Sequence, residues 1–357
     1  RIRATYKAKI WSVRFSITSS PKGPNGNHSC SVAVPERCSL DDCRSASNYR
    51  VSELSAARSL AAQLVIAVAY IHHQGYCHGD LHVGNILFRL PASIEYVSEG
   101  KRHGHFHGPW TPEPVVRVDK KPLGPGVPSH VYRPIWLGIR SDELTLPEAR
   151  LRLADFGIAF RPAEEARLKP FAPLYSRSPE ALFNQHKPFS FPSDIWSVAL
   201  ALWDMMGQSS LNSGLLFGHD EIVADLMDWD KWEDRSSWYE ENGGESRGSR
   251  DASWTLDRRL HHSQRPRHAP GAEGTSDDET DAFCSLIRSM LNFRPGHRPH
   301  ATQVLGFKWI QDWALNDYER TLKEASRVKW PRKPCGALLI SGVLWITLIA
   351  YLASNLM

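Results

Sequence analysis

A short stretch near residue 80 carries side chains that suit phosphoryl transfer. Residues 78–85 read His-Gly-Asp-Leu-His-Val-Gly-Asn, which places Asp80 and Asn85 five positions apart. The carboxylate of Asp80 can accept the proton of an attacking hydroxyl, and the amide of Asn85 can hold a metal ion that clamps nucleotide phosphates. Asp155, in the run Leu-Ala-Asp-Phe-Gly, offers a second carboxylate for Mg²⁺. Together these side chains predict a phosphotransfer site.

Several motifs resemble those of eukaryotic protein kinases and follow in that family's order. Residues 78–85 and 153–157 resemble its catalytic and metal-binding loops. The run Ser-Pro-Glu at 178–180 resembles the end of an activation segment. The run Ser-Asp-Ile-Trp-Ser at 193–197 resembles the start of the apolar F helix of protein kinases. The resemblance extends from about residue 28 to about residue 313. Within the superfamily, the sequence around residues 115–134 and 175–180 looks most like that of fungal relatives of the SR-protein kinases.

This resemblance implies a serine/threonine protein kinase that transfers the γ-phosphate of ATP to a protein hydroxyl, with ATP and Mg²⁺ as cofactors. Asp80 would be the catalytic base. His82, Asn85 and Asp155 would bind the nucleotide, and Asn85 and Asp155 would be the metal ligands. The implied partner is a protein substrate, with Arg/Ser-rich sequences as candidates, and no direct contact with nucleic acid is expected.

Three further residues have roles that the resemblance implies. Glu180 and Arg298 resemble the buried ion pair that fixes the activation segment in the family. Asp194 resembles the carboxylate that accepts hydrogen bonds from the catalytic-loop backbone; the alternative is a simple helix cap.

The sequence departs from the family pattern at three positions. Gly79 stands where the family usually has Arg, so we expect activity not to depend on phosphorylation of the activation loop through that Arg. His82 replaces the usual Lys; a histidine is mostly neutral at pH 7 and donates one hydrogen bond to a phosphate. Pro173 stands where a Thr normally contacts the catalytic Asp, which weakens any inference on Ser/Thr selectivity.

Two other functions compete with this interpretation. The run His-Gly-Asp-Leu-His-x-Gly-Asn is also typical of aminoglycoside and choline phosphotransferases, which phosphorylate small molecules. Glu180, Asp194 and Arg298 count against that class, because those enzymes do not carry the motifs around them. The second alternative is a catalytically inactive pseudokinase or scaffold held at a membrane. This alternative is favoured because the sequence before His78 contains neither a Gly-rich loop nor a VAIK-type lysine.

The first 40 residues are predicted to be the remnant of a kinase N-lobe and its hinge. The sequence upstream of His78 contains no GxGxxG run, and no Lys in a VAIK-like strand followed by a helix. A kinase uses both over the nucleotide phosphates. Residues 11–17 and 29–35 predict strands, with a turn at 22–26 and the hinge near 35–40. We expect the chain either to be a fragment or to lack the first half of this lobe.

The elements after residue 40 predict the helical lobe that must hold the site. Apolar residues recur at spacings of three and four over 52–73, with Ser52 as the expected N-cap. Further helices are predicted at 194–206, 281–291 and 301–314. The fold class is therefore α+β: a protein-kinase-like fold with a truncated β N-lobe and a mostly helical C-lobe at 41–314. Insertions are expected at about 89–150 and, loosely packed or disordered, at about 230–280.

Composition limits the compartment and the partners. The 357 residues suffice for two lobes, and the net charge of +4 gives no sign of nucleic-acid binding. Six cysteines without a CxxC pair fit a reducing compartment. The segment 315–334 is predicted to be a basic linker.

The last stretch, 335–357, contains no charged residue. At about 1.5 Å per residue it reaches about 34 Å, enough for a bilayer core of about 30 Å. Lys329, Arg332 and Lys333 precede it, as the positive-inside rule requires on the cytoplasmic side. We therefore predict a transmembrane helix that holds the protein at the cytoplasmic face of a membrane. The alternatives are a buried terminal helix and a gene-model artefact, which would leave the protein in the cytoplasm or nucleus.

Overall fold

The chain forms two structural units. The computed structural model describes residues 15–20, 22–23, 26–28, 30–33, 36–90, 112–132, 136–183, 188–211, 256–268 and 273–327. The first unit joins Arg1–Ser12, Arg37–Arg89 and Gly138–Val328; the second joins Val13–Glu36, Leu90–Leu137 and Lys329–Met357. The predicted transmembrane helix at 335–357 lies outside the described residues.

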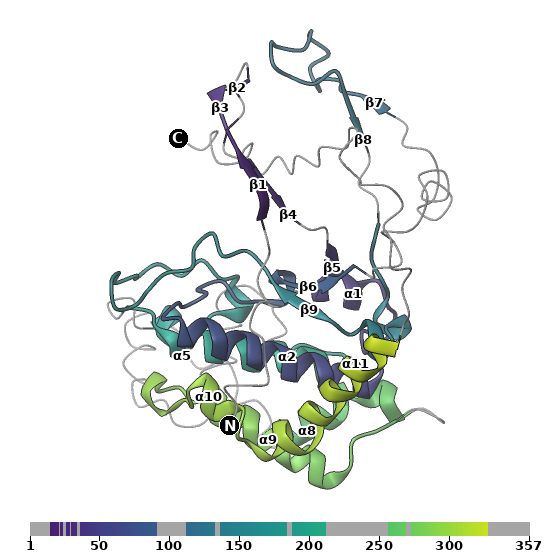
Figure 1. Ribbon diagram of the computed structural model, residues 1–357, viewed down its shortest axis with the longest axis vertical. Coiled ribbons are helices and arrows are strands. Elements are labelled where there is room, and N and C mark those ends of the chain that lie inside the picture. Colours follow the sequence, from purple (N-terminus) through teal and green to yellow (C-terminus); the bar gives the residue numbers. More distant parts are fainter. Residues whose placement is uncertain are drawn as a thin grey trace, which may run out of the picture. The chain divides into compact units, whose positions relative to one another are not determined.

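Helix α2 (Leu54–His73) is the core of the first unit (Figure 1). The predicted helix is confirmed, but its N-cap is Glu53 and not Ser52, and the Glu53 side chain makes no capping hydrogen bond. Gly75, with φ of +84°, ends the helix as a left-handed residue after the C-cap. α2 is long and apolar enough to cross a membrane, yet 83% of its most apolar window is buried inside this unit. It is therefore the central helix of a protein core.

Two helices pack along α2. Helix α5 (Phe191–Met206) lies against it, and so does helix α11 (Leu315–Arg327). The predicted apolar helix at 194–206 is confirmed and begins earlier, with Pro192 in its first turn. Trp196, Trp203 and Trp309 are fully buried in this core, which large aromatic side chains fill.

A small antiparallel sheet holds the loops that carry the predicted site. Strands β5 (Glu36–Ser39), β6 (Ile86–Arg89) and β9 (Leu151–Leu153) form it in that order. Ile86 pairs with Leu153 and Phe88 with Leu151. Because the pairing is antiparallel, the residue before Ile86 and the residue after Leu153 meet at the same end of the sheet. The buried amide of Gln63 on α2 donates to Ala149 O (2.6 Å) and accepts from Leu151 N (3.1 Å), which fixes β9 to the core helix.

The remaining elements of this unit are short or lie toward its C-terminal end. The short helices are α1 (Leu40–Ser45), η3 (Val83–Asn85), η5 (Ser141–Glu143), η6 (Leu146–Glu148), η7 (Leu174–Ser176) and α4 (Pro179–Phe183). The later elements are α8 (Leu256–Ser263), η8 (Arg265–His268), α9 (Asp277–Met290), η9 (Pro295–His297), α10 (Ala301–Val304) and the π-helix η10 (Ile310–Ala314).

Three predicted boundaries were wrong. The insertion does not extend to residue 150, because Ile139, Leu144 and Leu146 are buried in the core of the first unit. The second insertion contains the ordered helix α8, whose Leu260 is 1% exposed, while residues 230–255 lie outside the described residues. The segment predicted as a basic linker instead begins with α11, which packs on α2.

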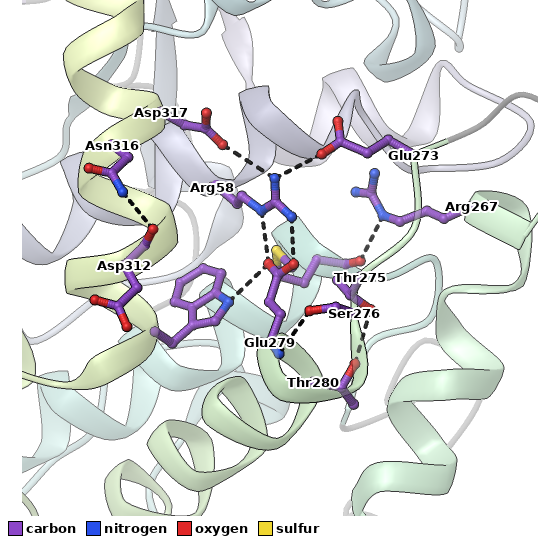
Figure 2. Close-up of polar contacts among 12 residues, drawn as sticks. Arg58, Arg267, Glu273, Thr275, Ser276, Glu279, Thr280, Asp312, Asn316 and Asp317 are labelled. Carbon is purple, nitrogen blue, oxygen red and sulfur yellow. Dashed lines mark hydrogen bonds and ion pairs between the residues drawn. The ribbon is translucent and has the colours of Figure 1, made fainter.

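A buried charge network ties α11, α9 and α2 together (Figure 2). Arg58 on α2 makes two hydrogen bonds to Glu279, which is 1% exposed, and pairs with Glu273 (2.9 Å) and Asp317 (3.5 Å). Trp309 Nε1 also donates to Glu279 Oε1 (3.2 Å). Since a buried carboxylate is costly without partners, this network requires all three helices to be in place.

The described part of the second unit contains three short antiparallel strand pairs. β1 (Phe15–Ser19) pairs antiparallel with β4 (Cys30–Ala33), β2 (Lys22–Gly23) with β3 (Gly26–Asn27), and β7 (Pro112–Pro114) with β8 (His130–Tyr132). The predicted turn near residue 24 and the strand predicted at 29–35 are both confirmed. Gly26, with φ of +112°, adopts a conformation that favours glycine after that turn.

Candidate active site

The loop at 78–80 is fixed by one buried carboxylate. Asp194, in the first turn of α5 and 2% exposed, accepts hydrogen bonds from His78 N (2.7 Å) and Gly79 N (3.0 Å). His72 Nε2 at the end of α2 lies 2.9 Å from the same carboxylate. Burial alone would raise the pKa of Asp194, but the hydrogen bond and charge of His72 and the backbone N–H of Gly79 hold that pKa below its usual value. The interaction expected from the family resemblance is therefore present, and Asp194 is more than a helix cap.

His78 connects this loop to the strand that leads to Asp155. Its Nε2 lies 2.9 Å from Ala154 O, and its ring stacks at 4.9 Å, tilted, on Phe156. Ala154 N in turn donates to Asn85 O (2.9 Å). These bonds join the two motif-bearing loops at the end of the β6–β9 pair, which is the side-by-side placement that the antiparallel register requires.

Asp80 and Asn85 face each other across the loop. Asn85 Nδ2 donates to Asp80 O (2.9 Å) and lies 3.4 Å from Asp80 Oδ2. This fixes the orientation of the amide, so its oxygen is turned away from Asp80. Asp80 Oδ1 is buried and has no hydrogen-bond partner among the described residues. An acceptor left in that state is suited to receive a hydroxyl from a substrate.

His82 lies beside Asp80 as a neutral side chain. Its Nδ1 accepts a hydrogen bond from Gly84 N (3.1 Å), which places the proton of the neutral ring on Nε2, 3.8 Å from Asp80 Oδ1. Burial lowers the pKa of His82, and the charge of Asp80 opposes this without reversing it. A Cβ at Gly84 would lie 2.7 Å from the His82 ring, so this close approach requires glycine.

Asp155 is exposed and adopts a left-handed backbone conformation, with φ of +58°. Such a conformation is uncommon for a residue other than glycine and is typical of functional positions. It follows Ala154 directly, so the Ala154–Asn85 bond holds it beside Asn85.

These residues fit a magnesium ion. The donor set is an amide oxygen and a carboxylate, and Mg²⁺ in nucleotide sites is held by one or two such oxygens together with phosphates and water. Among the residues that the structure describes, no group of three His, Cys, Asp or Glu side chains gathers to form a metal site. By their chemistry, Asn85 and Asp155 are the side chains that would hold the ion.

Beyond the loops, the activation segment is fixed at its end by the predicted ion pair. Arg298 Nη1 and Nη2 donate to Glu180 Oε1 (2.8 Å) and Oε2 (2.7 Å), and the Arg298 side chain is fully buried. Arg298 also donates to Pro192 O (2.9 Å), and Ser193 Oγ donates to Glu180 Oε1 (3.0 Å). Burial opposes ionisation of Glu180, but the Arg298 guanidinium holds the pKa of that carboxyl below its usual value.

Sequence reasoning missed two members of the site. His72 and His78 both bond the elements that hold Asp80 and Asp155, yet neither received a role from the sequence. His78 carried a usable signal in the sequence, since it stands two positions before Asp80 in the motif; the structure shows that its side chain is buried. The role of His72 depends on Asp194, 122 positions further along the chain, so no local pattern indicates it.

Comparison with known proteins links part of the chain to a family. Residues 140–310, just under half of the chain, match the family described as protein kinase domain. The chain is also similar in fold to the crystal structure of the kinase domain of PF14_0431, with a TM-score of 0.51 and 18% identity over 87% of this chain and 80% of that one. No curated protein matches the sequence.

A kinase-like fold with a large helical part is thus confirmed, and the match over residues 140–310 supports the predicted kinase superfamily. The matched residues include Asp155, Glu180, Asp194 and Arg298, and the catalytic loop at 78–85 lies before them. That loop is linked to the matched kinase region through Asp194 and Ala154.

Proposed function

We propose that this protein is a serine/threonine protein kinase of the SR-protein-kinase type, which transfers the γ-phosphate of ATP to a protein hydroxyl. The observation that supports it most is the placement of Asp80, Asn85 and Asp155 at one end of the β6–β9 pair, fixed by Asp194 and by the Ala154–Asn85 bond.

In this proposal each side chain has a defined task. Asp80 Oδ1 accepts the hydroxyl proton of the substrate and orients the oxygen for in-line attack. Asn85 holds Asp80 in place through Nδ2 and presents its oxygen to Mg²⁺ together with Asp155. The neutral His82 carries its proton on Nε2 and would donate one hydrogen bond from it to a phosphate of the nucleotide. The bound magnesium nucleotide supplies the phosphoryl group and the positive charge that stabilises the transition state.

The test is transfer of radiolabelled phosphate from Mg-ATP to an Arg-Ser repeat peptide by the full chain. We expect D80N to lower the rate by about 10²–10⁴-fold, because it removes the general base. D155A is expected to lower the rate and to raise the Mg²⁺ concentration needed for transfer, because one proposed metal ligand is lost. D142N, which alters an exposed Arg140 partner, is the matched control and should transfer at the normal rate. Equal rates for D80N and the unaltered chain would overturn the proposal.

The second candidate function is a pseudokinase or scaffold that transfers no phosphate. A thermal-shift measurement with Mg-ATP separates the two functions. A scaffold would show no shift in the unaltered chain or in D155A, whereas the kinase should show a shift that D155A loses. The small-molecule phosphotransferase is disfavoured by the Glu180–Arg298 ion pair and by the hold of Asp194 on the loop.

We also infer that the kinase acts at the cytoplasmic face of a membrane, held by residues 335–357. The support is the uncharged length of that stretch and the basic residues before it. The full chain should float with liposomes in a density gradient, and a chain ending at Arg327 should remain in the soluble fraction. Soluble behaviour of both would contradict this inference.

A further inference from the structure

The activation segment adopts a defined path although it crosses the surface with few backbone hydrogen bonds. It starts after Gly157, and its residues 161–169 are mostly exposed. Phe160 forms an isolated antiparallel bridge with Cys77, with Cys77 N donating to Phe160 O (2.8 Å) and Phe160 N to Cys77 O (3.0 Å). Beyond this bridge, a side chain must supply most of what holds the segment in place.

Arg167 is that side chain. Its guanidinium lies over the ring of Phe160 at 4.5 Å and near the ring of Phe171 at 5.6 Å. Its Nη1 donates to Ile158 O, and its Nε donates to Glu165 Oε1 (3.0 Å). One residue therefore joins the beginning, middle and end of the segment, and its side chain is 18% exposed. Both hydrogen bonds to a charged donor and cation–π contacts strengthen when water is excluded.

The same residue joins the segment to its surroundings. Phe189 N donates to Arg167 O (2.8 Å), which connects the segment to the chain that enters α5. Phe160 and Phe189 are buried in one apolar cluster with Cys77 and Ala181. Arg167 thus connects the catalytic-loop side of the site with the region that follows the segment.

Gly79 makes room for this arrangement. Its φ of +77° disfavours a side chain, and a Cβ there would lie 3.4 Å from Phe160 Cε1 and 3.6 Å from Ile158 O. Both of these groups are contacted by Arg167. A longer side chain at position 79 would compete for the space that the Phe160 ring and the Arg167 guanidinium share. The absence of a side chain at Gly79 therefore leaves the space in which Arg167 packs on Phe160.

We propose that Arg167 is a positioning residue that holds the activation segment against the catalytic loop without any phosphate on the segment, and so shapes the docking surface for the protein substrate. This deepens the proposed function and rests on it. The positive charge that organises the segment comes from within the segment itself.

Hydrogen exchange on the full chain tests the positional part. In R167M, the amides of Phe160 and Phe189 should exchange about tenfold faster or more, since two charge-assisted hydrogen bonds and two ring contacts are lost. Peptides from α2 should be unchanged. R167K keeps the charge over the rings but loses the planar guanidinium. The Phe160 and Phe189 amides in R167K should therefore exchange at rates between those of R167M and the unaltered chain. R161M is the matched control, because Arg161 contacts Tyr76 and Glu164 at the surface.

Two results would overturn the proposal. One is exchange at Phe160 and Phe189 in R167M equal to that of the unaltered chain. The other is faster exchange throughout the first unit, which would make Arg167 a general stability residue. Because exchange is measured without catalysis, it decides the matter even if the chain transfers no phosphate and the proposed function fails.

Kinetics test the functional part. R167M should raise KM for the Arg-Ser peptide about tenfold and leave KM for ATP within about twofold, because the lost interactions order the segment and not the nucleotide site. Phosphatase treatment of the unaltered chain should leave its rate unchanged. Loss of activity on phosphatase treatment would contradict the proposal directly.

Discussion

At the scale of single residues, His82 shows how a site controls protonation. Its Nδ1 accepts from Gly84 N, so a second proton on the ring would break that hydrogen bond, and burial disfavours the charge. Its folded-state pKa is therefore below the ordinary value of about 6.5. A base with a lowered pKa contributes stability that is present above its ordinary pKa and is lost as pH falls through the folded pKa.

We predict that His82→Asn flattens the pH dependence of stability on the acid side. Asn can accept from Gly84 N but does not titrate, so the difference in unfolding free energy between the two chains should change as pH falls below about 6.5. The slope cannot exceed about 1.4 kcal/mol per pH unit, the limit for one proton. Denaturant unfolding from pH 7.5 to 5 measures it. The neighbouring groups His78, Asp80, Asp41 and Asp155 are present in both chains, so the comparison reports the change at position 82. Parallel curves would refute the prediction.

Asp194 supports a second prediction at this scale. Asp194→Asn replaces one acceptor oxygen with an NH₂ group, so one of the N–H groups of His78 and Gly79 loses its partner. Leaving a buried donor unsatisfied should cost about 3 kcal/mol of unfolding free energy. Asp142→Asn, at an exposed Arg140 pair, should change it by less than about 1 kcal/mol. A loss at Asp194 no larger than this control would show that the carboxylate does not hold the loop.

At the scale of elements, the Glu180–Arg298 pair links the activation segment to the end of the lobe. Removing one partner of a buried ion pair leaves an uncompensated charge, so R298M should cost about 3–5 kcal/mol. The double variant E180M/R298M removes both charges and should be less destabilised than R298M alone. A double-mutant cycle by urea unfolding measures the coupling. Additive losses would mean that the two side chains do not interact in solution.

Sequence patterns predicted elements whose signal is local and missed those whose signal is distant. The apolar periodicity of 54–73 sufficed for α2, while its N-cap was misplaced because Ser52 contributes its carbonyl to Arg267 and not a side-chain cap. Helix α11 escaped because its buried positions include Asp317 and Thr321, which bond Arg58 and Ser59. These partners lie more than 250 residues earlier in the chain. The local sequence pattern therefore predicts that the polar face of α11 is exposed to solvent.

Deleting α11 should therefore cost more than losing a linker. A chain ending at Ala314 loses the Asp317–Arg58 pair, the Ser59–Thr321 hydroxyl contact and the buried ring of Tyr318. We expect a loss above about 3 kcal/mol, or insoluble protein, because Arg58 loses the carboxylate of Asp317 and the apolar surface of α2 under α11 is exposed. A chain ending at Arg327 is the control and should unfold at the midpoint of the full chain. Equal midpoints for both truncations would restore the linker interpretation.

At the scale of the whole molecule, the site depends on the first unit alone. The residues that position Asp80, Asn85 and Asp155 all lie within Arg37–Arg89 and Gly138–Val328. The sequence indicated the kinase-like lobe because its motifs are short and ordered. It misplaced the insertion boundary because the stretch 138–150 shows no periodicity, although Ile139, Leu144 and Ala149 are buried. Burial of an irregular segment is set by the surfaces it covers and not by its own pattern.

Replacing residues 91–136 with a linker of about ten Gly and Ser residues tests this division. Those residues belong to the second unit, and none of the described contacts of the site residues reaches them. Because loop-closure entropy changes only slowly with length, the unfolding free energy of the first unit should stay within about 1 kcal/mol of the full chain. Extending the deletion to residue 149 removes buried Leu144 and Leu146 and should cost several times more, about 4 kcal/mol. If the shorter deletion were as damaging as the longer one, the insertion would have to support the lobe, and the boundary at Gly138 would be wrong.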